Sequence, residues 1–236
     1  MAVRGGAAVH AITLLAAAHL DFTIVRDAAP DLARGALVTY YVTLAGLVGS
    51  LLVGITGAAM RTSGTAPARA LGTAFAEFFR NTPPVVHIFF AYFALPVIGI
   101  RLPAVVAGTI ALIFYQGAIN VEILRAGLEA VPKGQREAAE ALGLSGFDEF
   151  RYVIVPQAFR ISLPALGNNL ISLLKNSSLI SAIGTFEITG IAQDVIAIRL
   201  SSAELYLTIG AFYLASVFVL SGALRFTERR LARYGV

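Results

Sequence analysis

The amino-acid sequence predicts an all-α integral membrane protein with about five membrane-spanning helices. Of its 236 residues, 57% are apolar and only 14% are charged, and the mean hydropathy is +0.78. Such a composition does not suit the water-facing surface of a soluble protein. Several uncharged runs approach the ~20 residues that a helix needs to cross a hydrocarbon layer of ~30 Å. The chain has no cysteine and three scattered histidines, so we expect no thiolate or histidine-rich metal site.

The first span is expected over residues 36–60, a run without any charged residue. Small residues recur at every fourth position within it, at Gly46, Ser50, Gly54 and Ala58. This spacing either lets a second helix approach closely or is ordinary small-residue filler, and the sequence leaves both interpretations open.

The second hydrophobic region is divided, which predicts a discontinuous span. Two apolar segments, residues 70–79 and 85–100, are separated by a polar stretch that contains prolines. We expect Asn81 or Thr82 to cap a helix whose first turn holds Pro83, because the missing backbone N–H of a proline is harmless there.

Three further spans are expected over residues 102–124, about 161–184, and 205–224. Residues 125–160, between the third and the fourth span, are rich in charged side chains of both signs. A segment of this composition must lie in water, so the sequence predicts a long loop at one membrane surface.

The distribution of basic residues predicts an N-terminus outside and a C-terminus inside the cytoplasm. If the segments 61–80 and 125–160 and the C-terminal tail face the cytoplasm, that side holds 12 of the 18 lysines and arginines, in agreement with the positive-inside rule. The net charge of +4 is thus explained by orientation in a membrane, and we expect no nucleic-acid partner. The twelve basic residues are Arg61, Arg69, Arg80, Arg125, Lys133, Arg136, Arg151, Arg160, Arg225, Arg229, Arg230 and Arg233.

The expected organisation has three parts: an extracytoplasmic or interfacial segment at residues 1–34, a transmembrane domain at 35–230 and a cytoplasmic tail at 231–236. Residues 5–20 are uncharged, and an interfacial segment is favoured for them because the run is short and contains His10 and His19. A sixth span and a signal-peptide hydrophobic region are the open alternatives.

We expect the cytoplasmic loop to contain two short helices. Pro132 and Gly143 bracket an alanine-rich segment, as proline and glycine bracket many helices. Ser145 and Asp148 have the spacing of a capping box, which predicts a second helix that Pro156 ends. An exposed helix this short is marginal alone, so it either docks into a groove of a partner protein or forms a plain surface hairpin.

Six short motifs along the chain carry a resemblance to a known family. Each is weak alone, but in this order, over residues 35–230 of a chain with five expected spans, they resemble the membrane (permease) subunits of ABC importers, and among these the polar amino acid permease family. The three residues Glu137-Ala138-Ala139 followed by Gly143 resemble the EAA signature of those subunits. The motifs are Phe79-Arg80-Asn81-Thr82-Pro83-Pro84, Val131-Pro132-Lys133-Gly134-Gln135, Glu137-Ala138-Ala139, Leu142-Gly143-Leu144-Ser145, Pro156-Gln157-Ala158-Phe159-Arg160 and Leu174-Lys175-Asn176-Ser177-Ser178-Leu179.

The resemblance implies the fold of a type I ABC importer permease in the bacterial cytoplasmic membrane, with five core spans and a cytoplasmic coupling helix. It also implies partners: a second permease subunit, identical or different, two ATP-binding cassette ATPase subunits, an extracytoplasmic substrate-binding protein, membrane lipid, and a polar amino acid as substrate. The residues that would couple the loop to the ATPase are Lys133, Glu137, Ala138, Ala139, Gly143 and Ser145.

The chain contains no G-x-x-x-x-G-K-[ST] phosphate-binding loop. We therefore expect ATP to be bound and hydrolysed by the partner subunits, and this chain to be no enzyme and to bind no cofactor. The alternative is an autonomous homo-oligomeric channel or secondary transporter, which would leave the long charged loop unexplained.

Polar residues within the expected spans are the candidates for the translocation path. Five lie on the fourth span within an arc of roughly 120°, and such a stripe should face protein or a water-filled path rather than lipid. Lys175 either attracts a substrate carboxylate or pairs with an acidic residue such as Glu122 or Glu187. The five residues are Asn168, Asn169, Ser172, Lys175 and Asn176.

Two residues outside the fourth span complete the candidate path. Glu122 lies three residues before Arg125 on one helical face, so a local ion pair is expected unless Glu122 lines the path. His87 stands where the resembled family usually has glutamine, and we expect it to be a hydrogen-bonding core residue rather than a ligand or a proton relay.

Overall fold

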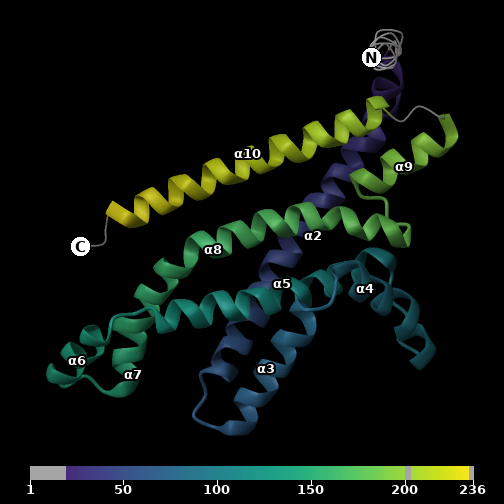
Figure 1. Cartoon of the computed structure of the whole chain (residues 1–236). Helices are drawn as coiled ribbons and strands as arrows, with labels where there is room; N and C mark the ends of the chain where they lie inside the picture. The colour runs from purple at the N-terminus through teal and green to yellow at the C-terminus, as the bar shows by residue number, and fades with distance from the viewer. Residues whose placement is uncertain (1–19, 200–202, 234–236) are drawn as a thin grey trace, which may run out of the picture.

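The computed structural model describes residues 20–199 and 203–233, and within these ranges it consists of helices and their connections (Figure 1). Two helical stretches pass from α-helical to π-helical or 3-10 geometry without a break. In order, the elements are α2 (Thr23–Arg61), α3 (Ala66–Arg80), α4 (Pro84–Phe89), a π-helical turn (Phe90–Ala94), a 3-10 turn (Leu95–Ile98), α5 (Ala104–Glu129), α6 (Lys133–Ala141), α7 (Gly146–Asp148), a π-helical turn (Glu149–Ile154), α8 (Val155–Asn176), a 3-10 helix (Ser177–Ile183), α9 (Ile188–Arg199) and α10 (Ala203–Arg233).

The described residues provide up to five membrane spans by length and composition. Helices α2, α5 and α10 are each long and apolar enough to cross a membrane. Two bent pairs meet the same test: α3 with the segment Pro84–Ile98, bent by 101°, and the segment Gly146–Ile183 with α9, bent by 44°. The predicted all-helical membrane fold with about five spans is confirmed.

The small residues at every fourth position of α2 allow close contact with a neighbouring helix. Gly46, Ser50, Gly54 and Ala58 are all buried, and a Cβ atom added at Gly54 would lie 2.5 Å from the Cβ of Asn120 on α5. Because no real side chain tolerates that separation, the glycine lets the backbones of α2 and α5 approach. Of the two interpretations of this spacing, the structure therefore favours close approach.

Helix α2 begins at Thr23, well before the run of uncharged residues that marks its span. Its N-terminal part shares a cluster of buried apolar residues with α9 and α10, which includes Ile24, Leu32, Ile188 and Leu205. This burial explains why the helix extends to Thr23 through a charged sequence. The uncertain run at residues 5–20 lies outside the described residues, apart from its last residue.

The predicted break lies between α3 and α4, but the residues predicted to cap α4 are wrong. Pro83 takes the N-cap position of α4 and Pro84 begins the helix. Asn81 and Thr82 instead bond back to α3: Asn81 Nδ2 donates to Glu77 Oε2 at 2.7 Å, and Thr82 Oγ1 donates to the carbonyl of Phe78 at 2.9 Å. The two side chains therefore complete the end of α3 rather than the start of α4.

Of the two helix boundaries predicted around Ser145 and Pro156, the first is confirmed and the second is wrong. Ser145 caps α7 as predicted, because its Oγ accepts a hydrogen bond from the backbone N–H of Asp148 at 3.2 Å. Pro156, however, does not end the second helix. The chain stays helical from Gly146 to Ile183. Pro156 lies directly after a π-helical turn, and this local change of helix geometry accommodates the proline without ending the helix.

Helix α9 lies between the fourth and the fifth expected span, where no helix was predicted. Glu187, just before the helix, accepts hydrogen bonds from the backbone N–H groups of Thr189 at 3.0 Å and Gly190 at 2.8 Å. These bonds satisfy donors of the first turn, as an N-terminal cap does. The preceding 3-10 helix ends at Gly184, whose φ of 71° suits glycine.

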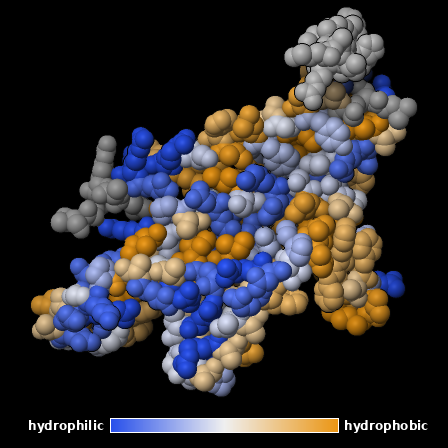
Figure 2. Space-filling view, viewed as in Figure 1, coloured by the Kyte–Doolittle hydropathy of each residue, from blue (hydrophilic) through white to orange (hydrophobic). Residues whose placement is uncertain are grey.

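Figure 2 shows how the surface divides between apolar and polar residues. Hydrophobic residues gather around α4 and along parts of α10, whereas hydrophilic residues predominate around α6 and α7. The exposed apolar side chains include Leu214, Phe218 and Val219 of α10 and Val97 and Ile98 after α4. Exposed apolar surface of this extent fits a protein surrounded by lipid and other subunits.

Candidate translocation pocket and coupling loop

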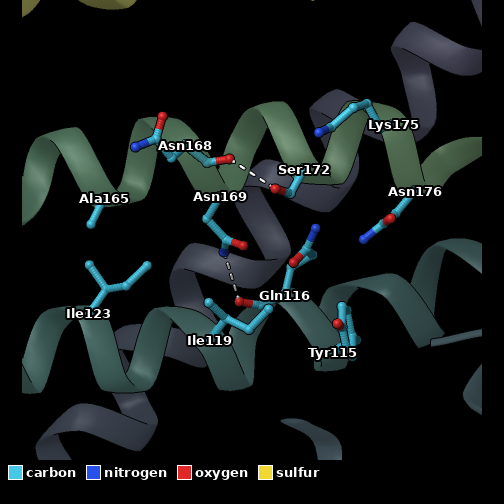
Figure 3. Close-up of a pocket in the computed structure, with 10 residues that line it drawn as sticks. All are labelled: Tyr115, Gln116, Ile119, Ile123, Ala165, Asn168, Asn169, Ser172, Lys175 and Asn176. Atoms are coloured by element: carbon cyan, nitrogen blue, oxygen red, sulfur yellow. Dashed lines mark hydrogen bonds between the residues drawn. The ribbon is translucent and has the colours of Figure 1, made fainter. Parts of the chain in front are cut away.

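A pocket of about 460 Å³ lies between α5 and α8 (Figure 3). Its size lies within the range of small-molecule sites, about 300–1,000 Å³. The five polar residues predicted on the fourth span all line it, so their expected common face exists. Its lining is Tyr115, Gln116, Ile119, Ile123, Ala165, Asn168, Asn169, Ser172, Lys175 and Asn176.

A chain of amide hydrogen bonds fixes the buried side of this pocket. Asn169 Nδ2 donates to the backbone carbonyl of Gln116 at 3.1 Å, a bond drawn in Figure 3, and also to Asn120 Oδ1 at 2.7 Å. Asn120 Nδ2 in turn donates to Ser50 Oγ of α2 at 3.3 Å. These bonds join α2, α5 and α8 through buried polar groups, which are stable only when satisfied.

Lys175 is an exposed residue at the open side of the pocket. Among the described residues it forms no ion pair, and the two acidic partners considered for it are engaged elsewhere. Glu122 pairs with arginines, and Glu187 accepts hydrogen bonds from Thr189, Gly190 and Tyr213. The structure therefore does not support a structural ion pair for Lys175 with either residue.

Glu122 lies outside the lining of this pocket, in a cluster of arginines. The expected pair with Arg125 is present, with 3.1 Å between Arg125 Nε and Glu122 Oε2. Arg61 at the end of α2 also contacts Glu122, and Arg80 Nη1 at the end of α3 lies 3.6 Å from Glu122 Oε1. One carboxylate thus connects α2, α3 and α5.

His87 is a buried residue that does not line the pocket. Its Nε2 lies 3.2 Å from the backbone carbonyl of Phe79, and its ring packs near Phe78, Phe79 and Tyr115. This is the hydrogen-bonding core role that was expected for it, and the structure separates His87 from the five residues of α8.

The loop residues project from one end of the molecule (Figure 1). Lys133, Glu137 and Ala138 of α6 and Gly143 and Ser145 after it are exposed, but Ala139 is only 3% exposed and faces inward. Two interactions hold α6 against the rest of the loop. Arg136 and Glu149 form an ion pair, with 3.8 Å between Nη1 and Oε1, and Gln157 Nε2 donates a hydrogen bond to Gln135 Oε1. Gly143 has a φ of 75°, which ends α6 in a turn suited to glycine.

Sequence reasoning placed two features of these sites incompletely. As polar residues on a shared face of the third span, Gln116 and Asn120 could be placed near the path from the sequence, but neither was included among the candidate path residues. The contacts of Arg61 and Arg80 with Glu122 had no sequence signal, because the three residues belong to different helices.

Apolar helices around a polar pocket, with a charged loop at one end, define a membrane transport subunit. The chain belongs to the family of binding-protein-dependent transport system inner membrane components, whose model matches residues 46–233. It is thus the permease component of an ABC transporter, a multi-pass inner membrane protein, and not an ATPase.

Curated relatives cover nearly the same length. The glutamine transport system permease protein GlnP of Escherichia coli strain K12 is 38% identical over 215 residues, which are 90% of this chain and 98% of that protein. The probable glutamine ABC transporter permease protein GlnM of Bacillus subtilis is 36% identical over 195 residues, covering 83% of this chain and 90% of that protein.

A solved structure of an amino acid ABC transporter with histidines matches this fold with a TM-score of 0.85. It is 34% identical and covers 89% of this chain and 99% of that one. The inward-facing methionine ABC transporter MetNI, 21% identical with a TM-score of 0.71, shares the fold.

Proposed function

We propose that this chain is the membrane subunit of an importer that carries a polar amino acid into the cell, with glutamine as the first candidate substrate. The observation that carries the proposal is the pocket between α5 and α8, whose amide, hydroxyl and ammonium groups suit a small zwitterion. The curated relatives that transport glutamine support the substrate class. The pocket would be part of the translocation path, which a second permease subunit and an extracytoplasmic binding protein complete.

We propose further that α6 is the coupling helix for two ATPase subunits. It is exposed, carries charges of both signs and is braced by Arg136 and Glu149, so it can move as a unit with α7 and α8. Closure of the ATPase subunits around ATP would displace α6, and rigid-body motion of the attached spans would alternate access to the pocket. The residues expected at this contact are Lys133, Glu137, Ala138, Gly143 and Ser145, while Ala139 supports the helix from its buried side.

We expect Lys175→Met to abolish uptake but not assembly. The substitution keeps a long apolar stem and removes the ammonium, which would otherwise form a charge-assisted hydrogen bond with the substrate carboxylate. ATP-driven uptake of labelled glutamine into vesicles that contain the whole transporter should fall at least about tenfold. Loss of the assembled complex would instead assign Lys175 a structural role, and unchanged uptake would remove it from the path.

The orientation proposed from the basic residues has a direct test, because the chain contains no cysteine. Single cysteines at the exposed positions Gly134 and Asp194 should report opposite sides of the membrane. In intact cells a membrane-impermeant maleimide should label Asp194→Cys, and Gly134→Cys only after the cells are opened. The reverse pattern would place the loop outside and contradict both the orientation and the coupling proposal.

A further inference from the structure

Gln116 has a side-chain amide that no described residue engages. The residue is 0% exposed, and neither Nε2 nor Oε1 has a hydrogen-bond partner. Its side chain extends from α5 toward α8, and Asn176 extends from α8 on the same side (Figure 3). Since buried amide atoms are rarely left without partners, this donor and this acceptor are free for a molecule that enters the pocket.

The neighbouring amide of Asn169 is not free in the same way. Both of its N–H groups are used, by Asn120 and by the backbone carbonyl of Gln116. Ser172 likewise donates its hydroxyl proton to the carbonyl of Asn168. The pocket therefore has a fixed polar framework, and Gln116 is its buried amide with both functions available.

The lining of the pocket carries positive charge and no negative charge. Lys175 is its one ionisable group apart from the phenol of Tyr115, and the lining contains no carboxylate. The nearby acidic residues are held elsewhere, Glu122 by three arginines and Glu187 by hydrogen bonds at the start of α9. A cationic side chain in this pocket would lose water, meet Lys175 and find no counter-charge.

We propose that Lys175 and Gln116 together select the substrate: Lys175 at the open side binds the α-carboxylate, and Gln116 at the buried side binds an uncharged amide side chain. A primary amide can both donate to Oε1 and accept from Nε2, whereas a carboxylate can only accept, and a guanidinium or ammonium can only donate. The expected order of preference is therefore glutamine, then glutamate, then arginine. This inference rests on the proposed function, because it requires the pocket to lie on the substrate path.

The test is equilibrium binding of labelled L-glutamine to the purified complex of permease and ATPase subunits, without the binding protein, so that selection by that protein plays no part. Unlabelled glutamine should displace the label, glutamate should do so less well, and excess arginine should fail. Gln116→Leu should weaken glutamine binding about tenfold, the loss expected for an amide contact. Gln116→Glu should let arginine compete, because the new carboxylate supplies its missing partner.

Controls separate this inference from the proposed function. Gln193→Leu makes the same change at an exposed position of α9 and should bind glutamine like the wild type, and co-purification with the ATPase verifies that each variant is assembled. If arginine displaces labelled glutamine as well as glutamine does, the proposed selection by Gln116 is wrong. The same conclusion follows if the Gln116→Leu variant binds glutamine like the wild type. A complex that imports glutamine but binds none directly would also overturn this selection and leave the importer function intact.

Discussion

Replacing Glu137 with lysine will separate this chain from its ATPase subunits and abolish uptake. Glu137 is exposed on α6, the helix at the projecting end of the molecule (Figure 1), and no other described residue pairs with it. A carboxylate in that position is available to a basic or donor group of a partner. Reversing its charge both removes the attraction and adds repulsion, for which a loss of about 3 kcal/mol, or roughly 100-fold in affinity, is expected.

The measurement is recovery of the ATPase with the tagged chain in mild detergent, together with ATP-driven uptake in vesicles. Asp194→Lys is the matched control, because it makes the same charge reversal at an exposed position of α9, at the far end from α6. That variant should retain both the ATPase and uptake. Equal recovery of the ATPase with Glu137→Lys and with the wild type would contradict the proposed coupling contact.

The spans could be predicted because each depends on a property of one continuous segment. Hydrophobic length marks α2, α5 and α10, and the prolines before α4 mark the broken span. Boundaries that depend on tertiary contacts could not be predicted in this way. Helix α2 continues to Thr23 because α9 and α10 cover its N-terminal part, and α9 starts where Glu187 satisfies its first backbone donors.

The same distinction applies to the site. Asn168, Asn169 and Lys175 could be placed on one face because helical periodicity alone determines their relative directions. The role of Gln116 depends on the distance between α5 and α8, which a single sequence does not contain. Ala139 belongs to the recognised loop motif, yet its side chain faces inward, so a motif indicates where a function lies without assigning a contact to every residue.

Glu122 shows what such tertiary information adds. The sequence predicts its local pair with Arg125, but the structure surrounds it with arginines from three helices, all partly buried. The side chain of Glu122 is 19% exposed, and those of Arg61, Arg80 and Arg125 are 17%, 38% and 29% exposed. The carboxylate therefore offsets several like charges where water screens them incompletely, and it ties the ends of α2 and α3 to α5.

Replacing Glu122 with glutamine is expected to destabilise the chain strongly, because the arginines would keep their charges without this counter-ion. Removing one partner of a buried ion pair costs about 3–5 kcal/mol, and since water screens Arg80, about 2–4 kcal/mol is expected here. The measurement is the thermal unfolding midpoint of the detergent-purified chain. Glu129→Gln is the control: Glu129 also pairs with Arg125, at 2.6 Å, but is 60% exposed, so its loss should cost under about 1 kcal/mol.

The double variant Glu122→Gln with Arg61→Gln distinguishes charge imbalance from a general loss of packing. If the uncompensated charge of Arg61 is the cause, removing it together with the carboxylate should recover part of the stability, because a neutral pair costs less than an orphaned charge. Glu122→Asp, which keeps the charge on a shorter side chain, should be more stable than Glu122→Gln. A double variant less stable than Glu122→Gln would mean that the arginines are held by other contacts and that Glu122 does not join the three helices.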